Sequence, residues 1–218
     1  MKILAIRQSR SGQNSSFITD TFDELTLAEA LTIGEKGVLE NITIVNITSG
    51  KQYLRSKRNK IQNDNLESKS ITCNEGDFLL FDGTTLFLKT VNGRNKRKWS
   101  ATSGKSEASF HDQDKPHFGP LPEGEYTVRF DKTMDISSSE HLWDSIKWIL
   151  KSPRWGFIVT PLEPSFKNKM YGRGDFYIHG GFFPGSKGCI DLQFENGAFH
   201  ILLRLYKHNF KLIVRYFS

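Results

Sequence analysis

The spacing of hydrophobic and polar residues changes near residue 76. Before that point, short apolar runs alternate with polar stretches. Lys2–Gln8 and Asn41–Ile47 predict strands, the second because its apolar residues are β-branched, and Leu25–Leu31 predicts a short helix. Lys51–Ser70 is rich in Lys, Arg, Asn and Ser and predicts an exposed polar arm or linker. Residues 1–75 are therefore expected to form a small N-terminal region that contains β-structure.

After residue 76 the pattern is more regular. Phe78–Phe81 and Leu86–Thr90 flank Asp82-Gly83, a pair that favours the turn of a β-hairpin. We therefore expect a mainly β (α+β) domain over residues 76–218, with one or two helices packed on it. Its further strands are predicted at Trp99–Gly104, Tyr126–Phe130, Phe157–Thr160, Asp175–His179 and Lys211–Phe217, and its helices at Ser139–Leu150 and Asn196–His208.

One stretch of this region carries candidate chemistry. His179 and Cys189 lie ten residues apart, at the end of a predicted strand and after a Gly-Ser-x-Gly turn, with four glycines between them. A thiol becomes a nucleophile as the thiolate, and an imidazole is the usual group that takes its proton. Glycines let the backbone approach a substrate and aim N–H groups at an oxyanion. The pattern indicates a catalytic Cys/His site, with Cys189 expected to be exposed.

The amino-acid composition and net charge exclude few classes of function. The 218 residues carry a formal net charge of +6, which suits an anionic polymer such as nucleic acid or cell wall, but simple solubility explains it slightly better. Cys73 and Cys189 are the two cysteines. They either pair with each other or, as we favour, comprise one reactive and one ordinary thiol. No CxxC or HExxH pattern occurs, so no metal and no cofactor is implied.

The chain shows no stretch of the roughly 20 apolar residues that a membrane-spanning helix needs. Its N-terminus has a positive start but neither a sustained apolar run nor a cleavage-like site, so it does not predict a secretory signal. We expect synthesis in the cytoplasm, with any export depending on another route.

About two thirds of the chain, from near Phe78 to Tyr216, resembles the L,D-transpeptidase (YkuD-like) catalytic domain. Within that family it is most similar to the compact branch found among type VI secretion effectors that attack peptidoglycan. The resemblance implies an L,D-transpeptidase-like β-sandwich or barrel. It is carried by Leu80–Gly83, Ser103-Gly104, Gly119–Tyr126, Arg173, Ile178–Gly181 and Gly185–Leu192.

The same resemblance implies the roles of the central residues. Cys189 would be the nucleophile and His179 its base, while the carbonyl of Gly180 would orient the imidazole, so that no carboxylate third member is needed. The N–H groups of Gly188 and Cys189 would form the oxyanion hole, and Ser186 would shape the turn. The His–Cys spacing is shorter than in the larger transpeptidases, which suggests a more open cleft.

Four further residues are candidates for substrate binding. Arg173 either clamps a substrate carboxylate or is surface charge. Lys187, where larger relatives have a second histidine, either acts on the thiol or a substrate carboxylate or is solvated. Asp191 replaces a usual basic residue and either orients a neighbour or pairs with Arg173. Gly181 completes the set.

The resemblance predicts an enzyme that acts on the stem peptides of peptidoglycan, with L,D-carboxypeptidase, L,D-endopeptidase and transpeptidase outcomes all open. It favours an antibacterial effector delivered to a rival's periplasm, with secretion components and an immunity protein as partners. A catalytically silent wall-binding module is the alternative. Nucleic-acid binding through Arg55–Lys60 and Arg94–Lys98 is disfavoured, because no aromatics are interleaved with those basic runs. For residues 1–75, loading, delivery and cleft shielding remain open.

Overall fold

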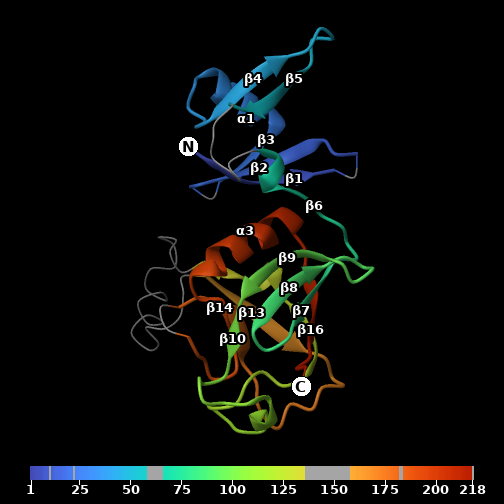
Figure 1. The fold of residues 1–218 in the computed structure, drawn as a ribbon, viewed down its shortest axis with the longest axis vertical. Coiled ribbons are helices and arrows are strands. Elements are labelled where there is room, and N and C mark those ends of the chain that lie inside the picture. The colour runs from blue at the N-terminus through green and yellow to red at the C-terminus, as the bar shows by residue number, and fades with distance from the viewer. Residues whose placement is uncertain (10, 22, 58–65, 136–157, 182–183, 218) are drawn as a thin grey trace. The chain divides into compact units, whose positions relative to one another are not determined.

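The computed structural model describes residues 1–9, 11–21, 23–57, 66–135, 158–181 and 184–217, and the statements below concern these residues. The predicted helix Ser139–Leu150 lies outside them. The chain divides into two compact units, which we call the N-terminal and C-terminal units (Figure 1). The first comprises Met1–Asn74 with Arg204–Tyr206, and the second comprises Glu75–Leu203 with Lys207–Ser218.

The N-terminal unit contains a four-stranded sheet and a separate hairpin. In the sheet, the strand order is β3-β2-β1-β6, with β1 antiparallel to β2 and parallel to β6. The hairpin consists of the antiparallel strands β4 and β5. The elements are β1 (Ile3–Gln8), β2 (Asn14–Thr19), β3 (Glu24–Thr26), α1 (Leu27–Glu35), β4 (Ile42–Asn46), β5 (Gln52–Ser56), a 3-10 turn (Leu66–Lys69) and β6 (Ser70–Thr72).

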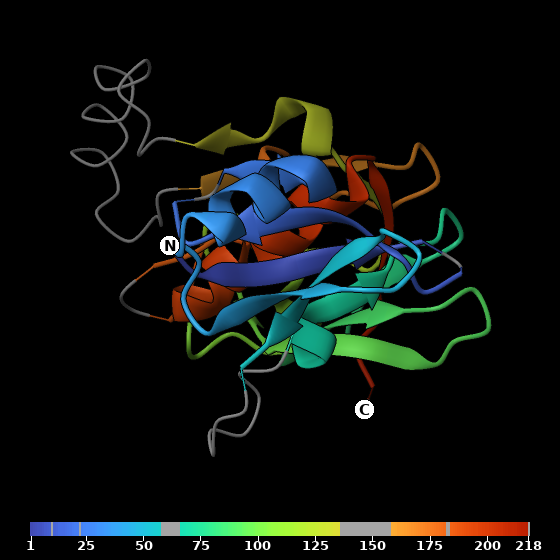
Figure 2. The same cartoon turned by 90° about the horizontal axis from the view of Figure 1, so that it is seen from above.

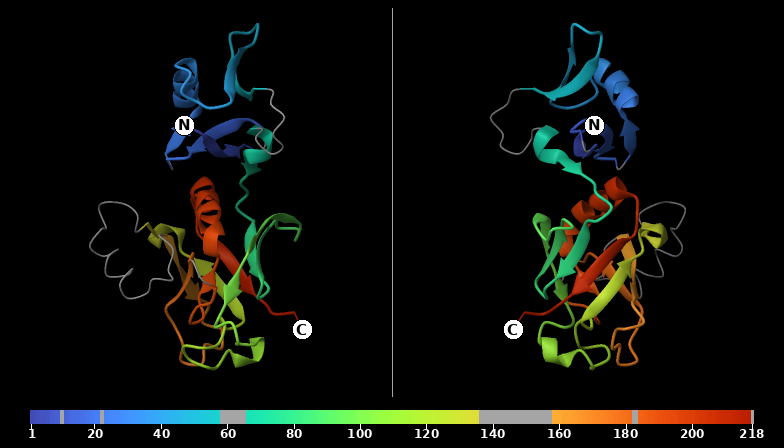
Figure 3. Two further views of the ribbon diagram at one scale, coloured as in Figure 1. Left: turned by 60° about the vertical axis from the view of Figure 1, so that its left-hand side comes forward. Right: turned by 90° about the vertical axis from the view of Figure 1, so that its right-hand side faces the viewer.

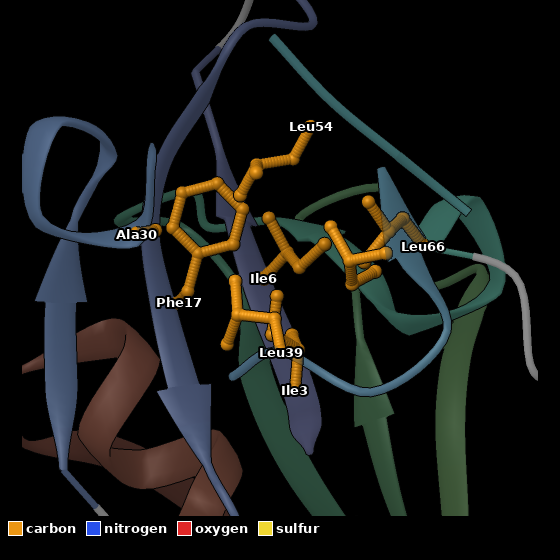
Figure 4. Close-up of a cluster of buried hydrophobic side chains, with 8 residues drawn as sticks. Ile3, Ile6, Phe17, Ala30, Leu39, Leu54 and Leu66 are labelled. Carbon is orange, nitrogen blue, oxygen red and sulfur yellow. The ribbon is translucent and has the colours of Figure 1, made fainter. Parts of the chain in front are cut away.

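Helix α1 begins at a well-formed cap. Thr26 Oγ1 accepts the backbone N–H of Glu29 (3.3 Å), and Glu29 Oε2 accepts the N–H of Thr26 (2.8 Å), which satisfies two donors that the helix leaves open. The helix contacts β2, β3, β4 and β5 (Figure 2). It helps to enclose a cluster of buried apolar side chains (Figure 4), which consists of Ile3, Ile6, Phe17, Ala30, Leu39, Ile42, Leu54 and Leu66.

Part of the predicted polar arm is ordered structure, and this corrects the sequence-based expectation. Residues 52–56 form β5, in which Leu54 lies opposite Ile44 and Tyr53 lies opposite Val45. Leu54 is buried in the core of the unit. Two apolar residues were enough to form a strand, because a partner strand of β-branched residues precedes them in the chain. Residues 58–65 of the arm lie outside the described residues.

The C-terminal unit is built on one large sheet. Its strand order is β10-β15-β14-β13-β11-β16-β7-β8-β9, and β12 pairs with β13 beside this path. Figure 3 shows the neighbouring strands β7 (teal-green), β16 (red) and β11 (yellow-green) side by side. The strands are β7 (Phe78–Phe81), β8 (Thr85–Lys89), β9 (Asn95–Ser100), β10 (Thr102–Ser103), β11 (Gly124–Val128), β12 (Met134–Asp135), β13 (Ile158–Pro164), β14 (Phe176–His179), β15 (Ile190–Asp191) and β16 (Phe210–Val214).

This sheet curls into a nearly closed barrel. The strands β9 and β10 lie at opposite ends of the hydrogen-bonded path, yet a single residue, Ala101, separates them in the chain. Ser100 and Thr102, the adjoining ends of the two strands, are two residues apart and so lie within about 7 Å of each other, which brings the two ends of the sheet together. The inward faces of β7 and β8 carry Leu79, Phe81, Leu86 and Leu88, all fully buried. The barrel interior is therefore a packed apolar core.

The predicted hairpin forms as expected. Gly83 adopts a left-handed φ of +105°, and Asp82 Oδ1 accepts the N–H groups of Thr84 (2.9 Å) and Thr85 (2.7 Å). Helix α3 (Asn196–Tyr206) also lies where a helix was predicted. The mainly β class, with helices packed on barrel-like strands and a small β-containing N-terminal region, is confirmed.

Helix α3 packs on strands β9 and β13 of the sheet. The ring of Phe199 on α3 meets Trp99 of β9 edge-on, with centroids 5.3 Å apart. At the helix start, Asn196 Nδ2 donates to the carbonyl of Ile158 in β13 (2.9 Å). These contacts fix the segment between β15 and α3, and this segment in turn packs against Gly180.

Candidate active site

The strand pair β14–β15 brings the His179 and Cys189 segments together. The two strands are parallel, with Ile178 opposite Ile190 and His179 opposite Asp191. Cys189 immediately precedes β15, so it comes from the neighbouring strand, two positions out of register with His179. The pairing therefore places a thiol, an imidazole and a carboxylate within one small region.

The imidazole of His179 is buried and oriented by its own backbone. Its Nδ1 lies 2.9 Å from the carbonyl oxygen of Gly180, so Nδ1 carries the proton and Nε2 is the proton acceptor. This is the contact expected for Gly180. A side chain at Gly180 would come within 2.6 Å of the carbonyl oxygen of Gln193, so only glycine allows this approach. Burial lowers the pKa of His179 and favours the neutral base.

Asp191 faces the other side of that ring nitrogen. Its Oδ1 lies 4.0 Å from His179 Nδ1 and accepts the N–H of Gln193 (2.8 Å). The side chain is fully buried, and burial raises the pKa of the carboxyl group, against the opposing effects of the Gln193 N–H and the imidazole. Of the two roles that the sequence left open for Asp191, orienting a neighbour and pairing with Arg173, the second does not match the described contacts, in which the Arg173 guanidinium donates to four backbone carbonyls. The reason is the parallel pairing of β14 and β15, which places Asp191 opposite His179. Residue types alone do not predict this pairing.

Cys189 is buried, with 5% of its surface exposed, which corrects the prediction of an exposed nucleophile. Burial raises the pKa of its thiol to about 12, although the backbone N–H of Tyr177 and the Arg173 charge act to lower it. Its Sγ lies 4.0 Å from the carbonyl oxygen of Asp175. The resting group is therefore a thiol, and a base must remove its proton when it attacks.

The turn before Cys189 is held by the hydroxyl of Ser186. This Oγ donates to the Cys189 carbonyl (2.6 Å) and accepts the N–H of Gly188 (3.2 Å), while the Ser186 N–H donates to the Gly104 carbonyl (2.8 Å). Ser186 thus shapes the turn as expected. The N–H of Gly188, expected to be open as an oxyanion donor, already has a partner in this state.

Arg173 has a structural position rather than that of an open substrate clamp. Its guanidinium donates to four backbone carbonyls and lies over the ring of Phe176, 5.2 Å from the centroid. Gly188 has φ +111°, and a side chain there would collide with this guanidinium. Arg173 therefore ties the cysteine turn to a distant loop, and its four acceptors are Gln113 (2.6 Å), Pro120 (2.7 Å), Gly119 (2.8 Å) and Lys187 (3.1 Å).

The remaining candidates differ in exposure. Lys187 is exposed, whereas Gly181 is buried and is followed by residues 182–183, which lie outside the described part of the chain. In the second basic run, Lys96 pairs with the buried carboxylate of Asp77. The first run, Arg55–Lys60, is only partly described.

Among the described residues, no group of three or more His, Cys, Asp or Glu side chains is placed to hold a metal ion. In the same part of the chain, no helix has the length and hydropathy of a membrane span.

Comparisons with families of proteins give one match, which lies in the N-terminal unit. Residues 2–70 match a family described as a protein of unknown function (DUF3892). No protein of curated function matches the chain. The family match covers less than a third of the sequence, and it says nothing of the site.

Among solved structures, the chain is similar to three L,D-transpeptidases. That of Xylanimonas cellulosilytica (residues 123–326) is 18% identical with a TM-score of 0.35, over 68% of this chain and 66%, just under two thirds, of that one. That of Mycobacterium smegmatis is 15% identical with a TM-score of 0.34, over 81% and 78%. L,D-transpeptidase 1 of Mycobacterium tuberculosis is 17% identical with a TM-score of 0.34, over 74% and 70%. At this level of similarity, the chemistry has to be argued from the site's own residues.

Proposed function

We propose that the C-terminal unit is a cysteine-dependent acyl-transfer enzyme that acts on the stem peptides of bacterial peptidoglycan. The observation that carries this proposal is the imidazole of His179, buried and fixed by the Gly180 carbonyl at Nδ1, on the strand beside the Cys189 turn. The choice of peptidoglycan rests on the resemblance of Ile178–Gly181 and Gly185–Leu192 to the L,D-transpeptidase motif.

The proposed reaction follows from the protonation states of the two groups, a neutral imidazole on His179 and a protonated thiol on Cys189. Neutral His179 takes the thiol proton at Nε2 as the Cys189 sulfur attacks an amide carbonyl. The tetrahedral intermediate expels an amine, which receives the proton from the imidazolium, and a thioester on Cys189 remains. Water or a second amine then attacks the thioester, giving hydrolysis or transpeptidation. Because the resting thiol has a raised pKa, proton removal accompanies the attack instead of preceding it.

The oxyanion donors in this scheme are backbone N–H groups of the cysteine turn. The N–H of Gly188 reaches a substrate only when its bond to Ser186 Oγ (3.2 Å) opens. In this scheme, substrate binding opens this hydrogen bond and exposes the buried sulfur of Cys189. In this proposal, carboxypeptidase, endopeptidase and transpeptidase activity differ only in the amine released and in the group that attacks the thioester.

We propose further that the protein is an antibacterial effector that a secretion system delivers to the periplasm of a target bacterium. This rests on the resemblance to the compact effector branch. An immunity protein in the producing cell is the expected partner, because a wall-degrading enzyme endangers its own producer. The N-terminal unit is then a candidate for loading, delivery or shielding of the cleft.

One observation favours a second candidate, a catalytically silent peptidoglycan-binding module. Cys189 is buried and its pKa is raised to about 12, which is the environment of an inert structural thiol. In this alternative, the site binds stem peptides without cleaving them, and a Cys189→Ala variant binds as well as the native protein.

The test is incubation of isolated muropeptides with the purified protein, with products read by mass spectrometry. Cys189→Ala removes the nucleophile, and Cys73→Ala is the matched control because it removes the other thiol. We expect products with the native protein and Cys73→Ala but not with Cys189→Ala, and their masses identify the bond cut. Binding without products from any of the three proteins would support the silent module.

A further inference from the structure

We infer that Asp191 is a positioning residue, a buried carboxylate that stabilises the imidazolium of His179 when His179 takes the proton of Cys189. The inference rests on the proposed acyl transfer and supplies a charged third member. The L,D-transpeptidase motif implies no such member, since it assigns the orientation of the imidazole to the carbonyl of Gly180, although the sequence left open that Asp191 orients a neighbour.

The strand register produces this arrangement. His179 and Asp191 lie directly opposite each other in the parallel pair β14–β15, so their side chains leave the same face of the sheet. The N–H of Leu192 donates to the carbonyl of His179 (2.8 Å) and holds the two strands at this point. The resulting separation between Oδ1 and Nδ1 is 4.0 Å.

Two acceptors thus face one ring nitrogen. The Gly180 carbonyl, at 2.9 Å, takes the hydrogen bond and fixes the tautomer. The Asp191 oxygen, at 4.0 Å, is too far for a hydrogen bond but close enough for a strong charge interaction, because both side chains are at least 98% buried and water does not screen them. The carbonyl orients the neutral ring, while the carboxylate responds to the charge that the ring gains.

The anchoring of Asp191 supports this role. The N–H of Gln193, which donates to Oδ1, lies in a residue whose φ is +49°, a conformation that turns the chain back towards the carboxylate. A second backbone N–H, from Gly185, also favours the ionised carboxylate. Both hydrogen bonds act to lower the pKa of the carboxyl group and so oppose burial, which is the larger effect and raises it.

The proton balance is simple. The proton leaves Cys189 Sγ, binds His179 Nε2 and later passes to the departing amine. Asp191 stays ionised throughout and exchanges no proton. Between these two proton transfers, the negative charge of Asp191 stabilises the buried, positively charged imidazole.

Other titratable groups lie near His179 and bear on any pH measurement. Cys189 precedes β15, Tyr177 lies two residues earlier on β14, and Asp175 and Arg173 precede that strand. Helix α3 contributes the buried His200, while the opposing β13 residues Val159 and Thr160 carry no charge. Asp191 is the charged side chain that acts on the pKa of His179, and it raises it against the effect of burial.

The first experiment measures the pKa of His179 by NMR of 13C-labelled histidine in the full chain, with the signal assigned through a His179→Gln variant. Asp191→Asn keeps the shape of the side chain and removes its charge, and Asp114→Asn, an exposed aspartate of the same unit, is the matched control. We expect the pKa of His179 to fall by about 1 to 3 pH units in Asp191→Asn and to stay unchanged in Asp114→Asn. An unchanged pKa in Asp191→Asn would overturn the inference.

The second measurement needs no variant and applies even if Asp191→Asn fails to fold. The 13Cγ shift of Asp191 in the native protein reports whether its carboxyl group is ionised. We expect an ionised carboxylate at pH 7 whose shift responds when His179 is protonated. A neutral carboxylic acid at pH 7 would overturn the inference.

Neither measurement depends on a substrate. If muropeptides are not cleaved but the pKa of His179 falls in Asp191→Asn, the proposed function fails and the charge pairing stands. If muropeptides are cleaved, Asp191→Asn should lower kcat/KM by at least about tenfold and move its acid limb to lower pH. A lower plateau with an unmoved acid limb would show a merely structural role and would contradict the inference.

Discussion

The two units bury different kinds of side chain. The main buried cluster of the N-terminal unit is apolar and consists of aliphatic residues around Phe17 (Figure 4), and the buried polar residues beside it, Ser16 and Thr19, carry no charge. The β14–β15 region of the C-terminal unit buries three groups that can carry charge, namely His179, Cys189 and Asp191. The first arrangement stabilises a fold at no electrostatic cost. The second costs free energy, because burial disfavours the charged form of each group.

This difference shows where function is concentrated. Burial displaces the pKa values of all three groups, that of His179 downward and those of Cys189 and Asp191 upward. Clusters of displaced pKa values are typical of functional sites, where the protein gives up stability to adjust proton affinity. The N-terminal core resembles the interior of an ordinary small domain, in which shape alone decides stability.

The largest effect on stability is expected in the apolar core. Phe17→Ala should lower the free energy of unfolding of the N-terminal unit by about 3–5 kcal/mol, because Phe17 is fully buried and the change leaves a cavity. Phe17→Leu, the control, should cost less than about 1.5 kcal/mol. Hydrogen exchange of the β1 and β2 amides measures both. Equal losses would show that packing around Phe17 is loose.

The second prediction concerns the thiol. In a Cys73→Ser background, alkylation of Cys189 by iodoacetamide should rise about tenfold per pH unit from pH 7 to 10, because only the thiolate reacts and the pKa of Cys189 is about 12. The same protein unfolded in denaturant is the control and should level off near pH 9. A plateau in the alkylation rate of the folded protein below pH 9 would show that Cys189 rests as an activated thiolate and would contradict the contrast between the two units.

The third prediction concerns the polar network around the cysteine turn. Arg173→Ala should lower the free energy of unfolding of the C-terminal unit by about 2–4 kcal/mol, because four backbone carbonyls lose their donor. Arg173→Lys restores the charge but not the planar fork and should recover only part of the loss. Denaturant unfolding followed by tryptophan fluorescence measures this. Full recovery with lysine would mean that charge, not hydrogen bonding, holds the turn.

The smallest effect is expected at the cap of α1. Thr26→Ala should cost about 1 kcal/mol, since the N–H of Glu29 loses its acceptor, and Thr26→Ser should be nearly neutral. Denaturant unfolding of the N-terminal unit, followed by circular dichroism, compares the two variants. Equal losses in both would exclude the hydroxyl group as the cause.

Much of the fold could be predicted because local signals agreed with the tertiary structure. The Asp82 side chain and the left-handed φ of Gly83 form a turn locally, and the β-branched run near Ile44 favours a strand and forms one here. Strand β5 was missed because the polar residues around Leu54 mask the one side chain that enters the core. A linker and an edge strand have similar amino-acid compositions, so only the presence of a partner strand distinguishes one from the other.

The site could be predicted only as far as its motif is local. The bond between His179 and Gly180 joins neighbours in sequence, and it was expected. The position of Asp191 depends on a parallel pairing with His179, twelve residues earlier in the chain. Three of the four hydrogen-bond partners of Arg173 lie 53 to 60 residues away from it. Contacts between residues so far apart in the sequence cannot be predicted from residue types.

The central claim is that Cys189 forms a thioester with a peptidoglycan stem peptide. The most direct measurement is the intact mass of the full chain, acid-quenched during turnover of defined tetrapeptide and pentapeptide muropeptides, with the modified peptide mapped after digestion. We predict a transient mass gain equal to the acyl fragment, located on Cys189, present in Cys73→Ala and absent in Cys189→Ala. Cleavage products that form in Cys189→Ala, or an adduct on another residue, would contradict the account.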